Sequence, residues 1–167
     1  MKAHGIMVSA MLVIAALPEQ ANAAPGRAAE FTLSDQNARV HRFTFPKSKI
    51  SVLVLSDHQG SSQIASWIEP LYRKYGTRID IAGIAAIPGI PSMFHGLFRR
   101  EFKKQLAYPV MLDWSGAIAR RFAYAGKEAE LLVLDVDGRI IFRKTGSAEP
   151  ASLNSAIKAI EASLGTP

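Results

Sequence analysis

The chain has 167 residues, enough for one domain with a substantial hydrophobic core but not for two. Hydrophobic residues make up 49% of it and charged residues 20%, a balance that excludes an intrinsically disordered chain. The formal net charge of +6 favours attraction to anionic surfaces, and the absence of cysteine excludes disulfide bonds and thiol redox chemistry by this chain.

The first 23 residues have the pattern of a secretory signal peptide. The basic Lys2 precedes an apolar run over residues 5–17, and Ala21 and Ala23 form a small-x-small cleavage site. The apolar run is shorter than a membrane-spanning helix, which needs about 20 residues. We therefore predict cleavage after Ala23, export of the chain, and a short flexible lead-in over residues 24–30.

The remaining residues, 31–167, are predicted to form one domain. Their first half has the patterns of a β-hairpin, a buried strand, a helix and a second buried strand. These elements are expected at residues 31–33 with 40–45, 50–55, 61–75 and 78–86. Pro70 lies inside the helical pattern and is expected to bend the helix or end its first half.

The second half predicts a basic amphipathic helix, a short strand and helix, a hairpin and a closing helix. The expected positions are residues 92–106, 110–112, 115–122, 131–135 with 139–144, and 151–164. The pair Asp137 and Gly138 is a strong signal for the hairpin turn. This order predicts an α/β fold with a mixed β-sheet and helices on both faces.

The order and motifs of residues 31–164 resemble the thioredoxin-like fold, in its peroxiredoxin and TlpA-like thiol-disulfide oxidoreductase branch. The motifs that carry the likeness lie at residues 50–55, 70–76, 108–113 and 116–140. Within this superfamily the chain is most similar to the small periplasmic YtfJ-like proteins, through residues 87–89, 93–94, 102–104, 108–109 and 133–139. The resemblance implies the fold and a periplasmic location.

The chain departs from this family at the residues that carry its redox chemistry. Redox members have a Cys-x-x-Cys motif or a lone peroxidatic cysteine at the corner between the buried strand and the next helix. Here the corner, residues 57–63, reads Asp-His-Gln-Gly-Ser-Ser-Gln. The family's cis-proline, which packs against the cysteines, falls at Ala129. The family's redox activity is therefore not carried over, and we predict a non-redox binding or interaction module without catalytic residues or a cofactor.

The corner still occupies a favoured position for ligands, because loops converge at the carboxyl ends of parallel strands and helices begin there with free N–H groups. We predict that it binds a peptide, an acidic partner or a small anion, the last on the N–H groups of Ser62 and Gln63. The candidate site residues are Asp57, His58, Ser61, Ser62 and Gln63. A compatible interpretation is that Ser61 or Ser62 caps the helix.

An alternative function is a periplasmic copper carrier or an enzyme that uses the same edge of the sheet. His58, Met93 and His95 would supply imidazole and thioether groups, a soft ligand set that suits copper. The competing interpretation is that both histidines are surface or helix-end residues, since no carboxylate or thiolate accompanies them at a fixed spacing.

The helix predicted at residues 92–106 carries Arg99, Arg100, Lys103 and Lys104 within two turns. We predict that this face meets a protein partner or an anionic membrane surface, unless it is simply solvated. Nucleic acid is not an expected partner, because an exported protein rarely meets it and no recognition motif is present. A third possibility is a structural role in an envelope complex, in which the basic face matters and the corner does not.

Overall fold

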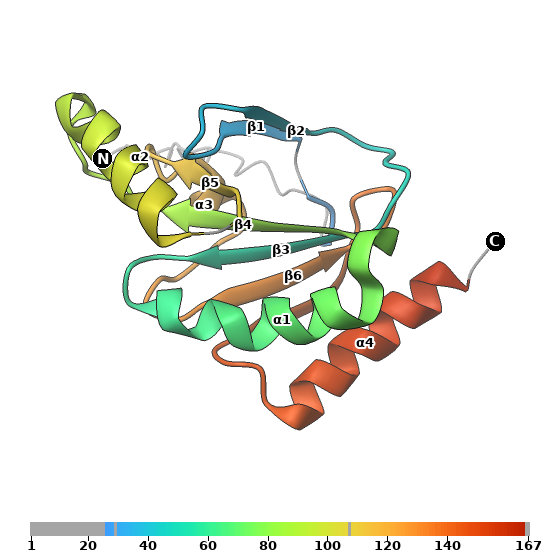
Figure 1. Ribbon diagram of the computed structural model, residues 1–167. Helices are drawn as coiled ribbons and strands as arrows, with labels where there is room; N and C mark the ends of the chain where they lie inside the picture. The colour runs from blue at the N-terminus through green and yellow to red at the C-terminus, as the bar shows by residue number, and fades with distance from the viewer. Residues whose placement is uncertain (1–25, 29, 107, 166–167) are drawn as a thin grey trace, which may run out of the picture.

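The computed structural model of the protein describes residues 26–28, 30–106 and 108–165 (Figure 1). The predicted signal peptide lies outside the described residues. At their centre is a five-stranded sheet in the order β5-β4-β3-β6-β7. Its strands are β3 (Ser51–Ser56), β4 (Asp80–Ala86), β5 (Val110–Asp113), β6 (Glu130–Leu134) and β7 (Ile140–Thr145). The strands β3, β4 and β5 are parallel, whereas β6 and β7 are antiparallel additions, which confirms the predicted mixed sheet of an α/β fold.

Helices cover both faces of this sheet (Figure 1). One face carries α1 (Ile64–Tyr75) and α4 (Pro150–Leu164), and the other carries the short α3 (Ala117–Arg121). A separate hairpin of β1 (Phe31–Ser34) and β2 (Val40–Phe43) packs on the α3 side. The helix α2 (His95–Gln105) lies near β5. The described residues also contain the 3₁₀ turns η1 (Gly60–Gln63), η2 (Gly76–Arg78) and η3 (Ser92–Phe94).

The central strand β3 explains how the core is divided. Val52 and Val54 pack with α1 and α4, whereas Leu53 and Leu55 pack with the hairpin and α3. All four side chains are fully buried, because a strand in the middle of a two-sided sheet meets helices or strands on both faces. The run Ile-Ser-Val-Leu-Val-Leu at residues 50–55, apolar except for Ser51, therefore predicted this strand correctly.

Two segments differ from the sequence expectation. The helix α1 continues through Pro70 to Tyr75, so the expected end at the proline is wrong, while the expected bend stays a prediction. Buried Trp67, Leu71 and Tyr75 hold the helix against the core on both sides of that position. Part of the predicted lead-in is held by the β6–β7 turn, where the Ala28 N–H donates to the Gly138 carbonyl at 2.7 Å. None of the helices within the described residues is both long and apolar enough to span a bilayer.

Candidate functional site

A groove with a volume of about 1070 Å³ lies at the predicted corner. Its walls come from the corner after β3, the carboxyl half of β4, the helix α2 and the loop before β6. The convergence follows from the topology, because the parallel strands β3 and β4 both end at this edge of the sheet. The groove is thus a concave surface, built at the ends of two parallel strands, on which the fold can hold a ligand.

Asp57 lines the groove and forms hydrogen bonds to backbone groups within the chain. Its carboxylate accepts hydrogen bonds from the backbone N–H of Gly60 at 2.9 Å and from that of Lys127 at 2.8 Å. Burial raises the pKa of Asp57, but the hydrogen bonds from Lys127 and Gly60 outweigh this effect and hold the pKa below its ordinary value. Asp57 is therefore an ionised side chain that ties the corner to the loop before β6.

Gln63 makes a second tie between the same two segments. Its side-chain Oε1 accepts a hydrogen bond from the Ala129 N–H at 2.8 Å, and Ala129 directly precedes β6. The Tyr124 hydroxyl donates to the Glu128 carbonyl at 2.8 Å and accepts the Asp57 N–H at 2.9 Å. The N–H groups of Lys127 and Ala129 and the carbonyl of Glu128 are therefore already hydrogen-bonded within the chain and are not free to bind a ligand.

The other three candidate residues of the corner, His58, Ser61 and Ser62, are exposed and line the groove. The expectation that Ser61 or Ser62 caps the helix is wrong: neither makes a capping hydrogen bond, and the Ser61 hydroxyl donates to the His58 carbonyl at 2.8 Å instead. Asp57 instead accepts the N–H of Gly60, the first residue of η1. Because its carboxylate already sits at the start of η1, a bound anion there would meet a like charge.

The side of the groove that α2 forms is mainly apolar, although Glu101 and Gln105 also line it, and it was not identified from the sequence. The groove is lined there by Phe98 and Phe102 of α2 and by Leu106, the residue that follows the helix. Ile87 and Ile90, from the loop after β4, also line the groove. Phe98 is 37% exposed, while Phe102 also packs on the small cluster around Leu112. The four-residue spacing of positions 98, 102 and 106 is the sequence signal that would have indicated this wall.

The residues of the copper alternative are not brought together as one set. His95 stacks on Trp114 with ring centroids 3.7 Å apart, and its Nε2 lies 3.0 Å from the Ile90 carbonyl oxygen. Met93 is 79% exposed, and of the three residues only His58 lines the groove. In the part of the chain that the structure describes, no group of three or more His, Cys, Asp or Glu side chains is arranged to hold a metal. The copper alternative therefore stays a prediction.

The four basic residues of α2 have different surroundings. Arg99 points inward, where it donates to the Asp35 carbonyl at 3.0 Å and lies over the Trp114 ring at 5.9 Å. Arg100, Lys103 and Lys104 are exposed, and Lys104 pairs with Glu101 at 3.0 Å. Arg99 is thus an anchor for α2, and the accessible positive charge belongs to the other three.

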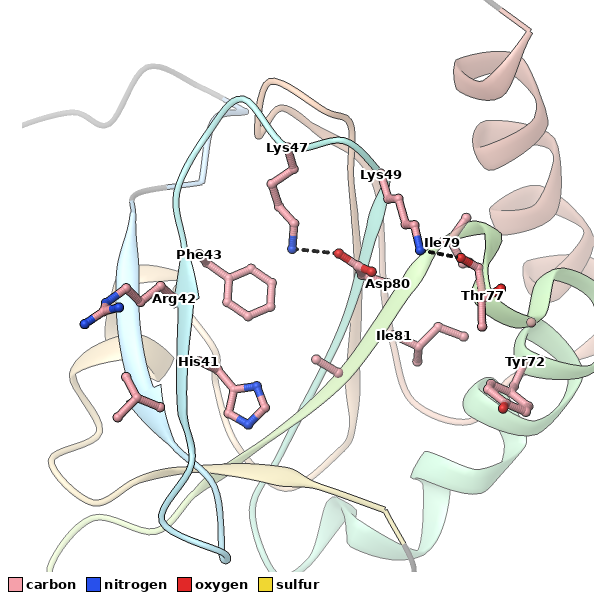
Figure 2. A pocket seen from close by; sticks show the side chains of 13 residues that line it. His41, Arg42, Phe43, Lys47, Lys49, Tyr72, Thr77, Ile79, Asp80 and Ile81 are labelled. Atoms are coloured by element: carbon pink, nitrogen blue, oxygen red, sulfur yellow. Dashed lines mark hydrogen bonds and ion pairs between the residues drawn. The ribbon is translucent and has the colours of Figure 1, made fainter.

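A smaller pocket of about 570 Å³ lies at the opposite end of β4, between that strand and β2 (Figure 2). Its lysines are already engaged, since Lys47 pairs with Asp80 at 2.9 Å and Lys49 donates to the Thr77 carbonyl at 2.7 Å. Arg42 points away from the pocket in Figure 2. We therefore regard the groove at the corner as the better candidate.

Comparison with solved structures confirms the thioredoxin-like fold. A thiol:disulfide interchange protein DsbE from Chlorobium tepidum has a TM-score of 0.64 at 16% identity, over 84% of this chain and 96% of its own. The exposed lipoprotein thioredoxin Etrx1 of Streptococcus pneumoniae has a TM-score of 0.61 at 19% identity, over 78% and 98% of the two chains. Peroxidoxin BcpB from Mycobacterium tuberculosis has a TM-score of 0.58 at 22% identity, over 82% and 96%. No protein-family model and no curated protein sequence matches the chain.

Proposed function

We propose that the chain is a non-redox binding module that holds an extended polypeptide segment in the groove at the corner. The observation that carries this proposal is that one groove is lined both by the apolar side chains of Phe98, Phe102 and Leu106 and by the polar His58 and Ser61. A mainly apolar concave surface with a few polar groups at its edge is typical of sites that bind peptides and other small ligands.

The chemistry of the corner supports binding without catalysis. The chain has no cysteine, so it has no thiolate to attack a disulfide or a peroxide. Asp57 and Gln63, which stand in the region where redox relatives have reactive groups, are engaged by backbone N–H groups. A ligand therefore meets the exposed His58, Ser61 and Ser62 together with the α2 side chains.

We also propose that the protein is exported and works in the periplasm. The proposal is supported by the signal-peptide pattern of residues 1–23, and one structural neighbour is described as an exposed lipoprotein. The similarity to YtfJ-like proteins points the same way and rests on the sequence motifs alone. N-terminal sequencing of the protein purified from cells is the direct test, with Ala24 expected as the first residue.

Peptide binding is tested by fluorescence anisotropy with labelled unstructured peptides that contain a central phenylalanine or leucine, or serine at that position. We expect saturable binding of the apolar peptides only. Phe98→Ser removes an exposed part of the apolar wall and should weaken binding roughly tenfold.

Phe94→Ser is the matched control, because Phe94 is an exposed phenylalanine one turn away that does not line the groove. It should bind peptide like the unsubstituted chain. Equal binding by the Phe98→Ser and unsubstituted proteins, or no preference for apolar peptides, would refute the proposal. Circular dichroism of each variant establishes that the fold is retained.

A further inference from the structure

The outer face of α2, together with the 3₁₀ turn η3 that leads into it, exposes apolar side chains that do not belong to the groove: Met93 lies in η3 and Leu97 in α2. Met93 is 79% and Leu97 47% exposed, and neither lines the groove. No residue of α2 is buried, and in Figure 1 the helix projects from the domain on the side away from α4. These apolar groups therefore remain in water unless something covers them.

Basic side chains continue the same face toward the end of the helix. Positions 93, 97, 100 and 104 follow one another at helical spacing, so Met93, Leu97, Arg100 and Lys104 form one stripe, with Lys103 beside it. Within the described residues, Arg100 and Lys103 form no ion pair, and Lys104 pairs only with Glu101. We call these five residues the outer stripe.

We propose that the outer stripe binds the surface of a membrane that contains anionic phospholipids. A helix face that combines exposed apolar side chains with Lys and Arg is typical of interfacial membrane contacts. The apolar groups would enter the headgroup region while the basic groups meet lipid phosphates. A projecting helix reaches a flat lipid surface without needing a complementary cavity, and the net charge of +6 adds attraction at long range.

The outer stripe and the groove lie on different sides of the same helix, because Phe98 and Phe102 face the groove. Membrane contact through the stripe would therefore leave the groove-lining side chains of α2 uncovered. The two proposals stand on different residues, and either can fail without the other.

The test is co-sedimentation of the exported form, from Ala24 onward, with vesicles of phosphatidylcholine alone or mixed with phosphatidylglycerol. We expect binding to the anionic vesicles only, and weaker binding at high salt because salt screens exposed charges. Arg100→Glu with Lys103→Glu should weaken binding by roughly tenfold or more. Met93→Ser with Leu97→Ser leaves the charge unchanged and should also weaken it.

The matched control is Lys144→Glu with Lys158→Glu, which changes the net charge equally through exposed residues of β7 and α4. It should retain most of the binding. An equal loss in this control would show that overall charge, and not α2, is responsible, and would overturn the proposal. Binding that is absent from anionic vesicles would also overturn it and leave an acidic protein as the partner to seek.

The absence of cysteine provides an independent readout of contact with the lipid. Leu97→Cys, labelled with an environment-sensitive fluorophore, should shift its emission to the blue when anionic vesicles are added. Tyr72→Cys, at an exposed position of α1, should not shift its emission. An unchanged spectrum at position 97 in vesicle-bound protein would contradict the proposed orientation.

Discussion

The Asp57 carboxylate accepts the Lys127 N–H at 2.8 Å, which joins the corner after β3 to the loop before β6 across 70 residues of sequence. With the bond from Gly60, it places one negative charge where both segments present backbone donors. In thioredoxin-like redox proteins these two segments meet through cysteine and cis-proline. In this chain a carboxylate and an amide side chain make the connection, so the shape of the groove depends on them.

Asp57→Asn should destabilise the fold by about 1–3 kcal/mol at neutral pH, because an amide NH₂ group would replace one of the two acceptors that face N–H donors. The pKa of Asp57 is lowered by folding, so its stabilisation is complete above the unfolded value near 3.9 and is lost as pH falls through the folded pKa. Urea unfolding should therefore show a large difference between the two proteins at neutral pH, and this difference should shrink as the pH falls through the folded pKa of Asp57.

Glu69→Gln removes an exposed carboxylate from α1 and serves as the control, with little change in the free energy of unfolding expected at neutral pH. A difference between Asp57→Asn and the unsubstituted protein that stays constant down to acid pH would mean that the charge of Asp57 does not carry the stabilisation.

Gly60→Ala should destabilise the protein by about 1–3 kcal/mol, since an added Cβ would lie 2.6 Å from the Ala129 nitrogen and push the corner away from β6. Gly96→Ala is the opposite case: nothing lies within 4 Å of its Cβ, and it stands in α2. Alanine there should stabilise the protein by about 0.5–1 kcal/mol. Chemical denaturation measures the change in the free energy of unfolding for each variant, which should be a loss for Gly60→Ala and a gain for Gly96→Ala. Equal changes would contradict the close approach of the corner to β6.

The features that the sequence predicted depend on residues close together in the chain, whereas those that it missed depend on residues far apart in the chain. The buried strand β3 and the turn at Gly138 depend on neighbouring residues, so periodicity and turn chemistry predicted them. The role of Asp57 depends on a loop 70 residues away, and nothing near Asp57 in the sequence indicates it. Ser61 looked like a helix cap because the competing acceptor, Asp57, can be recognised only when the corner is folded.

The groove and the basic helix α2 also depend on contacts between distant segments, which the local sequence does not indicate. Arg99 was grouped with Arg100 because both lie on one short stretch of helix, yet Arg99 turns inward to the Asp35 carbonyl. The apolar wall was missed because a phenylalanine of α2, such as Phe98, looks like an ordinary core residue in the sequence. Only the position of α2 beside the end of β4 leaves it facing a groove.

The two histidines of the predicted copper set should respond differently to substitution. His95→Ala removes a ring that stacks on Trp114 and should cost about 0.5–1.5 kcal/mol, whereas His58→Ala removes an exposed ring and should be nearly neutral. Thermal unfolding measures both, and repeating it with Cu(I), Cu(II) or Zn(II) tests the metal site. Saturable one-to-one stabilisation that is lost in the double variant would favour the copper alternative.

Tyr75 offers a prediction at alkaline pH. Its hydroxyl donates to the Glu161 carboxylate at 2.9 Å, and burial together with that carboxylate raises the pKa of Tyr75 above its ordinary value of 10. The protonated phenol therefore stabilises the fold up to the unfolded pKa, and this contribution is lost as pH rises through the folded pKa. Titration of the phenolate absorbance should show a late, high-pH phase that shrinks in Tyr75→Phe and moves to lower pH in Glu161→Gln. If neither variant changes the late phase, the bond between Tyr75 and Glu161 does not control this ionisation.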